Sequence, residues 1–351
     1  MTDYPWMVAK RLTRDEYLDR IESLASKNER QVGEAFLRAV RGIRDLATLE
    51  QVADALESGG ETALLQLFDS PDVSNELQVL SAAIGGAVMD GGRIAAETQP
   101  AVTGPRGGRV SFVFNQANPR LASFAERQTT QRVREITEDV RGVVRDVVRD
   151  EALAGRNPRD TARRIRESIG LTRRQERAVA NYRRLLENGD RAALERALRD
   201  RRFDSSVRRA VSGDRALSDD QIDRMVGRYR ERYLRYRSET IARTETIRAL
   251  SGANQEFLQG YIDSGEIDER QVRRFWHYTF DERTRAEHRQ IPAMNPDGVG
   301  MNEPFQTPLG PLMFPGDPMG AVSNVANCRC SVYQRVISAE LIGLTPEGAA
   351  A

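Results

Sequence analysis

The sequence predicts a mainly α-helical protein, with elongated helical N-terminal and middle regions followed by a small α+β module near the C-terminus. Three observations predict this fold class. Of the 351 residues, 30% are charged and only 6% are aromatic, a composition typical of helices with long solvated faces. Up to about residue 250, apolar residues recur at helical spacing. Beyond Gly260 they alternate, as they do in strands.

Residues 1–98 are predicted to form an N-terminal helical unit of several short helices. Thr13 and Glu16 have the spacing of a capping box, which marks the start of a helix. The pair Gly59-Gly60 is expected to break the helical pattern. Further helices are predicted near residues 31–46, 49–58 and 74–89. The last of these is the most apolar, so we expect it to pack inside the protein.

Residues 99–119 are predicted to be a linker with a short strand, because Pro and Gly punctuate it around the apolar run Val110–Phe114. A helical middle region over residues 120–250 follows. It begins with a long helix over residues 120–153, whose valines occupy one side. The arginines of this helix have acidic neighbours at ion-pair spacing. We interpret them as a solvated face rather than as a DNA-binding stripe.

Caps and stops mark the other helices of the middle region. Pro158 suits the first position of a helix. Thr172 and Gln175 form a second capping box, and the helix that they start is expected to stop at Asn188-Gly189. Two more helices are predicted, a short basic one over residues 190–202 and a long one from residue 218 to about residue 250.

A small α+β module is predicted over residues 251–337. Val272–Phe280 alternates in the manner of a strand, and a short helix is expected from near Asp281 to just before Pro292. Two further strands are predicted, Leu309–Phe314 and Ser331–Val336. Residues 338–351 are expected to form a flexible tail.

The net charge of +1 hides an uneven division along the chain. Residues 1–100 carry 10 basic and 17 acidic residues, residues 101–250 carry 35 and 22, and residues 251–351 carry 8 and 13. The middle of the chain, at +13, can neutralise phosphates or meet an acidic protein surface. Nearly all the basic residues of the chain are Arg, with Lys only at Lys10 and Lys27, and a GC-rich genome would also produce this without selection for binding.

Neither a secretion signal nor a membrane span is expected. Residues Met1–Arg11 lack the apolar stretch of a leader, and no run of about 18 apolar residues is apparent. We therefore expect synthesis in a cytoplasm and no membrane association. A disulfide between Cys328 and Cys330 would be strained, so these cysteines are expected to be free or to bind a metal.

Both histidines and both cysteines of the chain lie between His277 and Cys330. Zinc prefers thiolate and imidazole ligands in a tetrahedral set. Cys328, Cys330 and His288 are the predicted zinc ligands, with His277 or Asp281 as the fourth. The alternative is that these side chains simply pack inside the module, with His288 hydrogen-bonded to a backbone carbonyl.

Other residues of the module have predicted structural roles. Asp281 can cap a helix and can face Arg285 across one helical turn. Trp276 is expected to anchor the core, with one acceptor for its indole nitrogen. Pro315–Pro318 is predicted to form a rigid turn in which Gly316 is free to take a positive φ.

The order and spacing of several segments resemble the phage Mu F-like proteins, also called phage head morphogenesis or minor capsid proteins. The segments that carry this resemblance are Gly155–Pro158, Leu171–Gln175, Ala180–Arg184, Tyr236–Glu245, Trp276–Asp281, Arg285–His288, Phe314–Pro318 and Asn327–Cys330. The resemblance covers roughly residues 120–337. It says little about the first hundred residues.

The resemblance implies a low-copy, non-enzymatic protein of a tailed bacteriophage virion, located in the head near the portal vertex. Its implied role is in head morphogenesis, and in DNA packaging or ejection. The implied partners are the portal protein, the major capsid or scaffold protein and packaged DNA, together with further copies of the chain.

Two alternatives belong to other functional classes. One is a nucleic-acid-binding adaptor that uses the basic middle region. The other is a cysteine-dependent hydrolase with Cys328 or Cys330 as nucleophile and His288 as base. That chemistry needs the thiolate beside the base, and an oxyanion hole.

Overall fold

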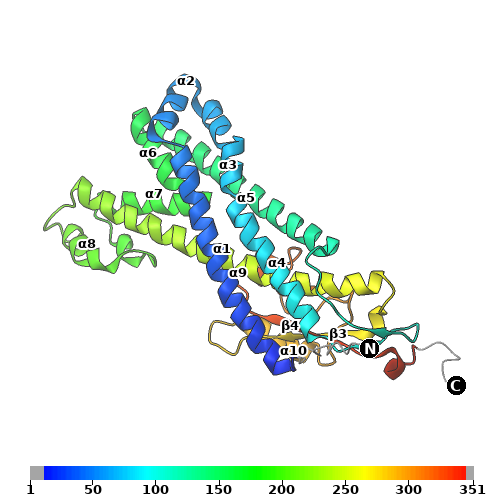
Figure 1. Cartoon of the computed structure of the whole chain (residues 1–351). Helices are drawn as coiled ribbons and strands as arrows, with labels where there is room; N and C mark the ends of the chain where they lie inside the picture. Colours follow the sequence, from blue (N-terminus) through cyan, green and yellow to red (C-terminus); the bar gives the residue numbers. More distant parts are fainter. Residues whose placement is uncertain (1–11, 345–351) are drawn as a thin grey trace, which may run out of the picture. The chain divides into compact units, whose positions relative to one another are not determined.

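The computed structural model describes residues 12–344, and this part of the chain is mainly helical (Figure 1). The α-helices are α1 (Arg14–Leu46), α2 (Leu49–Phe68), α3 (Pro71–Glu76), α4 (Gln78–Thr98), α5 (Pro119–Leu153), α6 (Pro158–Ser168), α7 (Arg173–Glu187), α8 (Asp204–Val211), α9 (Asp219–Asp263), α10 (Ala286–Met294) and α11 (Val322–Val325). The strands are β1 (Val102–Thr103), β2 (Arg109–Val110), β3 (Val272–His277) and β4 (Ser331–Val336). The predicted mainly helical chain with a small α+β part near the C-terminus is confirmed.

Two predictions fall partly outside the described residues. The expectation that no leader is present concerns residues 1–11, and much of the predicted tail is residues 345–351. The described start of that tail is not irregular, because Ala339–Ile342 form the 3-10 turn η4, in which Ala339 is buried.

The first helix, α1, is one continuous helix of 33 residues rather than the predicted series of short ones. Its capping box is confirmed, because the Thr13 N–H donates to Glu16 and the Glu16 N–H donates to the Thr13 hydroxyl. The polar residues Lys27 and Asn28 interrupt the apolar pattern in the sequence. In the fold, both side chains donate to the buried carboxylate of Asp90 on α4, so the helix continues through them.

The helices α6 and α7 start and stop where the caps predicted, whereas α9 runs to Asp263, beyond the end predicted near residue 250. Pro158 is the first residue of α6, Thr172 and Gln175 form the capping box of α7, and α7 ends at Glu187. The short helix predicted over residues 190–202 is wrong. This segment holds the 3-10 turns η1 (Arg191–Glu195) and η2 (Arg201–Phe203).

Aspartate side chains explain this difference. Asp190 and Asp200 each accept a hydrogen bond from the backbone N–H two residues further on. Such local bonds compete with helical hydrogen bonding and favour turns. The next helix, α8, was not predicted.

The described chain divides into two compact units, each made of segments far apart in the sequence. Among the described residues, unit 1 comprises 12–33, 80–130 and 240–344, and unit 2 comprises 34–79 and 131–239. The regions predicted from the sequence, in contrast, are contiguous. The C-terminal module, residues 251–337, lies entirely within unit 1.

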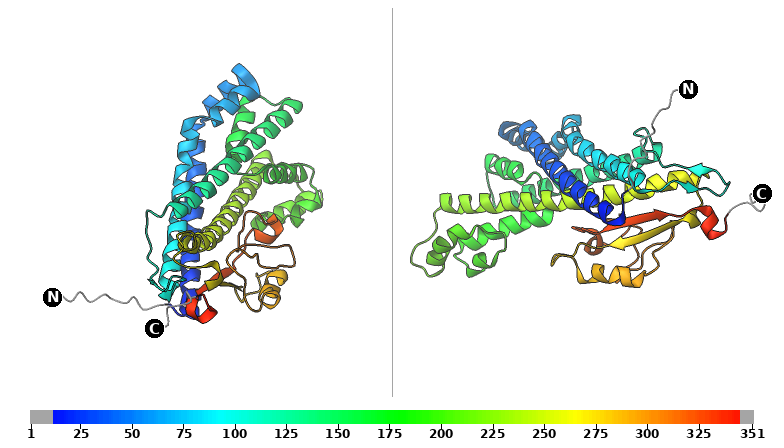
Figure 2. Two further views of the ribbon diagram at one scale, coloured as in Figure 1. Left: turned by 90° about the vertical axis from the view of Figure 1, so that its right-hand side faces the viewer. Right: turned by 60° about the horizontal axis from the view of Figure 1, so that its bottom comes forward.

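The C-terminal module is built on the antiparallel pair β3 and β4, whose register runs from Val272 opposite Val336 to His277 opposite Ser331. In both views of Figure 2 the two strands lie side by side, with α10 next to them. Strand β4 has the predicted bounds. The strand predicted at residues 309–314 is wrong, since Leu312 makes only an isolated bridge with Phe305.

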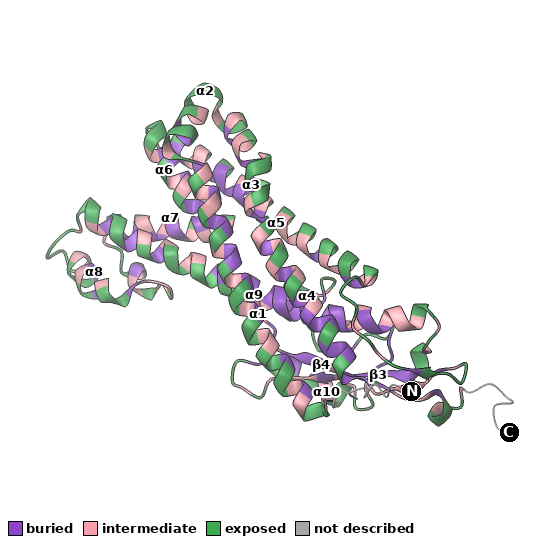
Figure 3. Cartoon of the chain, in the orientation of Figure 1, coloured by how far each residue is buried: buried purple, intermediate pink, exposed green. Residues whose placement is uncertain are grey.

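Only one helix in residues 12–344, α4, is long and apolar enough to cross a membrane, which the sequence analysis did not anticipate. However, 56% of its apolar window is buried inside the protein. The middle of α9 is buried in the same way, and Figure 3 shows these stretches of both helices largely in purple. Gly91 of α4 lies against the backbone of Leu250, where a Cβ atom would come within 2.9 Å of that residue's Cα. We therefore interpret α4 as a core helix.

Candidate metal centre

The C-terminal module brings together three of the predicted zinc ligands. His288 lies on α10, and Cys328 and Cys330 lie in the extended segment that precedes β4. One ligand atom from each residue lies within 4.8 Å of the other two. All three side chains are buried, so the cluster belongs to the core of the module rather than to its surface.

The distances within this cluster fit a tetrahedral metal ion. His288 Nδ1 lies 3.5 Å from Cys328 Sγ and 3.4 Å from Cys330 Sγ. Zinc bonds of about 2.3 Å to sulfur and about 2.0 Å to nitrogen, at a tetrahedral angle, separate the two donors by about 3.5 Å. The imidazole nitrogen therefore already lies at the distance from each sulfur that a shared zinc ion would impose.

Asn324 sets the tautomer of the histidine. His288 Nε2 lies 2.9 Å from Asn324 Oδ1, while the amide nitrogen of Asn324 donates to the Thr307 hydroxyl and to the Gly310 carbonyl. These two bonds fix the amide so that its oxygen faces His288. The Nε2 atom must then carry the proton, which leaves the lone pair of Nδ1 directed at the two sulfurs. Metal-binding histidines are commonly oriented by a second-shell oxygen in this way.

The three groups strongly perturb one another's protonation. The hydrogen bond from Cys330, with a smaller contribution from His288 when its imidazole is protonated, lowers the pKa of the Cys328 thiol to about 5. The hydrogen bond of Cys330 to Cys328 and the burial of Cys330 together raise the pKa of the Cys330 thiol. Burial lowers the pKa of His288, but the hydrogen bond and charge of Cys328 outweigh it, and the net shift is upward. A thiolate is thus favoured at this cluster, which is the form that binds metals.

Two N–H groups surround the sulfurs. The backbone N–H of Cys330 donates to Cys328 Sγ across 3.4 Å. Trp276 is buried as predicted and packs edge-on against His288 and Phe305. Its indole nitrogen has no hydrogen-bond partner among the described residues. It nevertheless lies close enough to Cys330 to offset part of the upward shift in the pKa of that thiol. Such donors stabilise negative charge on sulfur.

The turn before Cys328 is held by a helix that is distant in sequence. Asn327 has a φ of 56°, the left-handed conformation that Asn adopts more readily than most residues. Its backbone N–H donates to the Thr244 hydroxyl, and its side-chain oxygen accepts from Arg243. The Ile241–Glu245 part of α9 thus positions the segment that carries both cysteines.

The predicted turn at Pro315–Pro318 docks on the same helix. Gly316 has the predicted positive φ, 82°, and its carbonyl accepts from Arg248 of α9. A Cβ atom at Gly316 would lie 3.0 Å from the Arg248 backbone nitrogen, so the site favours glycine. Asp317 closes the turn by accepting the backbone N–H groups of Met313 and Met319.

The proposed fourth ligands, His277 and Asp281, do not join the cluster. His277 neighbours Trp276 on β3, so the two side chains point to opposite faces of the strand pair, and Trp276 contacts the cluster. Asp281 instead pairs with Arg329 across 2.6 Å. Within residues 12–344, the group that can share a metal contains His288, Cys328 and Cys330 alone.

The helix-capping role predicted for Asp281 also needs correction. Its carboxylate accepts the N–H groups of Arg283 and Thr284, but α10 begins later, at Ala286, and includes Pro292. Asp281 therefore caps a turn that precedes the helix. Arg285 does not face Asp281 either, because its guanidinium donates to the Ala326 carbonyl.

Sequence reasoning missed the residues that orient the ligands. Asn324 and Thr307 are common polar residue types with no distinctive spacing, so nothing in the sequence marks them. For Arg243 and Thr244 a signal was present, because both lie within the Tyr236–Glu245 segment of the resemblance.

Burial weighs against the cysteine-hydrolase alternative. Cys328, Cys330 and His288 are only 2%, 1% and 1% exposed. A catalytic thiolate must reach the carbonyl carbon of its substrate, and these sulfurs face each other and the imidazole in the core of the module. The arrangement suits a bound ion better than a covalent intermediate.

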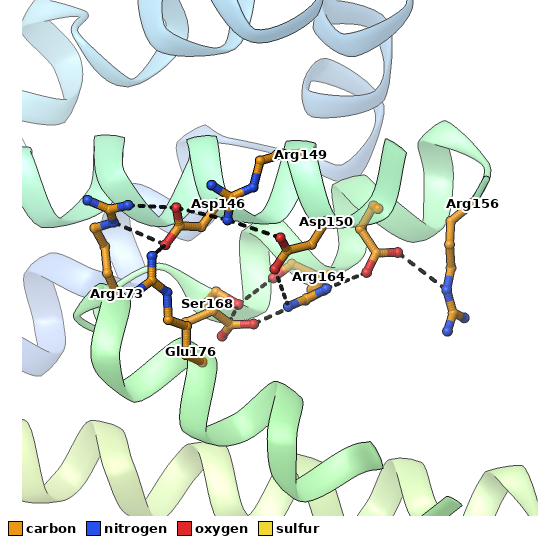
Figure 4. Close-up of polar contacts among 10 residues, drawn as sticks. Asp146, Arg149, Asp150, Arg156, Arg164, Ser168, Arg173 and Glu176 are labelled. Atoms are coloured by element: carbon orange, nitrogen blue, oxygen red, sulfur yellow. Dashed lines mark hydrogen bonds and ion pairs between the residues drawn. The ribbon is translucent and has the colours of Figure 1, made fainter. Parts of the chain in front are cut away.

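The basic middle region presents a different kind of polar cluster, in unit 2 (Figure 4). Asp146 accepts both nitrogens of the Arg173 fork at 2.8 and 3.0 Å. Arg177 and Arg149 also pair with Asp146. Arg173 and Arg177 hold the pKa of Asp146 below its usual range, chiefly through the hydrogen bonds from Arg173.

A second buried carboxylate, Glu176, continues this network. It accepts from Arg164 across 3.1 Å and from the Ser168 hydroxyl across 2.6 Å. Arg164 also donates to Glu151. The arginines around Asp146 and Glu176 are thus paired with carboxylates inside unit 2.

The chain matches no family model, no curated protein and no solved structure. A functional assignment therefore depends on the residues and the geometry described above.

Proposed function

We propose that this chain is a minor head protein of a tailed bacteriophage, and that its C-terminal module is a docking unit rather than an active site. One observation carries the proposal. Three segments on which the resemblance depends, Ile241–Glu245, Phe314–Pro318 and Asn327–Cys330, are scattered over 90 residues, yet both loops hydrogen-bond to α9. Because these segments contact one another in the fold, the same packing can account for the order and spacing in which they occur along the chain.

Co-purification with the portal protein tests this assignment. The chain would be co-expressed with the portal encoded by the same genome, and the mixture separated by size exclusion. We expect the two proteins to elute together, and an unrelated portal serves as the control. Separate elution of the cognate pair would contradict the assignment, whatever the metal content of the chain.

We further propose that His288, Cys328 and Cys330 hold one zinc ion with a structural role. The spacing of the donors and the tautomer fixed by Asn324 support zinc. In this proposal a water molecule completes the tetrahedral shell. The ion would tie α10 to the start of β4, two elements that are about 40 residues apart in the chain.

Cobalt substitution tests the ligand set, and the two histidines provide a matched pair of variants. We expect cobalt to give thiolate-to-metal charge-transfer absorption with the unaltered chain and with His277→Ala. His288→Ala should weaken or abolish it, because imidazole is one of three protein ligands. Equal spectra for the two variants would contradict the assignment of His288.

A further inference from the structure

A groove of about 760 Å³ lies on the other face of the strand pair from the candidate metal centre. Its walls come from the first half of α1, from α9, from the loop after β3 and from the start of β4. His277 and Ser331, which are opposite each other in the strand register, line it. All of its lining residues belong to unit 1.

The groove has an apolar part, in which Ile21 and Ile247 are buried, Leu18 and Ala25 are half-buried and Phe280 is exposed. Leu18, Ile21 and Ala25 recur at three- and four-residue spacing along α1, so they form one side of that helix. Ile247 of α9 lines the groove as well. Phe280 also lines it and is 77% exposed, although a large aromatic side chain gains most when it is covered.

A row of carboxylates borders this apolar surface. Asp15, Asp19 and Glu22 are spaced by four and three residues, lie on the groove side of α1 and are exposed. None of the three makes an ion pair or a side-chain hydrogen bond with residues 12–344.

Most of the basic groups in the groove are already paired. Arg329 binds Asp281 across 2.6 Å, and Arg243 donates to Asn327 and lies 3.7 Å from Glu29. Arg283 is left as an unpaired cation among the described lining residues. Three carboxylates against one guanidinium leave the groove with a net negative charge.

We propose that this groove docks a basic amphipathic segment of a partner protein. Apolar side chains of the segment would cover the exposed Phe280 and the half-buried Leu18, and its Lys or Arg residues would pair with the row formed by Asp15, Asp19 and Glu22. Nucleic acid fits poorly, because its phosphates would meet this row of carboxylates. The inference depends neither on the bound metal nor on the phage assignment.

Peptide binding to the full chain tests the inference. Two labelled amphipathic helical peptides with the same apolar residues would be compared by fluorescence anisotropy, one with Lys and one with Glu at every polar position. We expect the Lys peptide to bind. Its affinity should fall as salt rises, because exposed charge pairs are screened. The Glu peptide should not bind. Failure of the Lys peptide to bind at low salt, or equal binding of both peptides, would overturn the proposal.

Charge reversals on one helix locate the binding surface. Asp19→Lys with Glu22→Lys should weaken binding of the Lys peptide about tenfold or more. The matched control is Glu34→Lys with Asp45→Lys, since these exposed residues lie on α1 but outside the groove. Phe280→Ala should weaken binding with little change in its salt dependence. Equal losses for the two double variants would overturn the proposal, as would binding of a DNA oligonucleotide that the Asp19/Glu22 variant abolishes.

Discussion

The His–Cys cluster of unit 1 and the ion-pair network of unit 2 are both rich in titratable side chains, but they differ in how those side chains are satisfied. In the network, each buried carboxylate is matched by guanidiniums, as Asp146 is by Arg173 and Arg177. In the cluster, three metal-binding atoms face one another. A dense group of charged side chains is therefore not in itself evidence of a ligand-binding site. A better sign of a ligand is a set of donor atoms that converge on one point and are oriented by neighbouring residues, as His288 is by Asn324.

The two regions also treat buried arginine differently. Arg164 of unit 2 is bound by the carboxylates Glu151 and Glu176. In the C-terminal module Arg274 is fully buried and donates to the carbonyls of Gly300, Glu303 and Met313. Burial lowers the pKa of Arg274 to about 10, so it remains charged at neutral pH. A single cation thus holds several turns of the loop-rich module in place.

The largest effect on stability is expected from Arg274→Met. This substitution removes a buried guanidinium that donates to three carbonyl oxygens, so we expect a loss of about 3 kcal/mol or more in the free energy of unfolding. Chemical denaturation measures it. The adjacent and exposed Arg273 is the matched control, and Arg273→Met should have a much smaller effect. Similar losses for both variants would mean that Arg274 does not organise the module.

Asn324→Leu should weaken metal binding about 10- to 100-fold, because His288 would lose the acceptor that fixes its tautomer. Competition with a chromophoric chelator measures the affinity. Asn324→Asp keeps an oxygen for Nε2 and should retain most of the affinity. If the Asp variant were as weak as the Leu variant, Asn324 would not act by orienting the histidine.

Asp146→Asn should lower the stability of unit 2 by about 1–2 kcal/mol at neutral pH, because the charge-assisted hydrogen bonds from Arg173 and Arg177 are weakened. The pKa of Asp146 is below its ordinary value of 3.8. Its contribution is therefore present above that value and is lost as pH falls through the lowered pKa. Urea unfolding should show the two proteins converging at acid pH. A difference that persists when Asp146 of the unaltered protein is protonated would point to packing instead.

The smallest effect is expected where both partners of an ion pair are exposed. Arg163 and Asp160 lie 3.4 Å apart on the surface of α6. Arg163→Gln should change the unfolding free energy by less than about 0.5 kcal/mol. A loss above 1 kcal/mol in the unfolding free energy would show that exposed ion pairs also stabilise unit 2 substantially.

Much of the helical fold could be predicted because its signals are local. The capping boxes of α1 and α7 and the first residue of α6 depend on residues within one turn of each other. The continuity of α1 could not be predicted in this way, because Asn28 is satisfied by Asp90, 62 positions further along the chain. The division into two units could not be predicted from local signals either, because each unit contains segments that are far apart in the sequence.

The candidate site divides along the same line. His288, Cys328 and Cys330 could be predicted because these residue types are rare in the chain and prefer the same metals. His277 shared that rarity but lies one position from Trp276 on a strand, and a shift of one residue reverses the face. Asn324 and Thr244 gain their roles only from the tertiary fold.

Metal content tests the central claim most directly. The full chain, purified without chelators, would be analysed by elemental mass spectrometry beside Cys328→Ser/Cys330→Ser, and circular dichroism would establish that both are folded. The structure predicts about one zinc ion per chain for the unaltered protein and almost none for the double variant. Well under one ion per folded, unaltered chain, or equal content in both proteins, would contradict the metal centre.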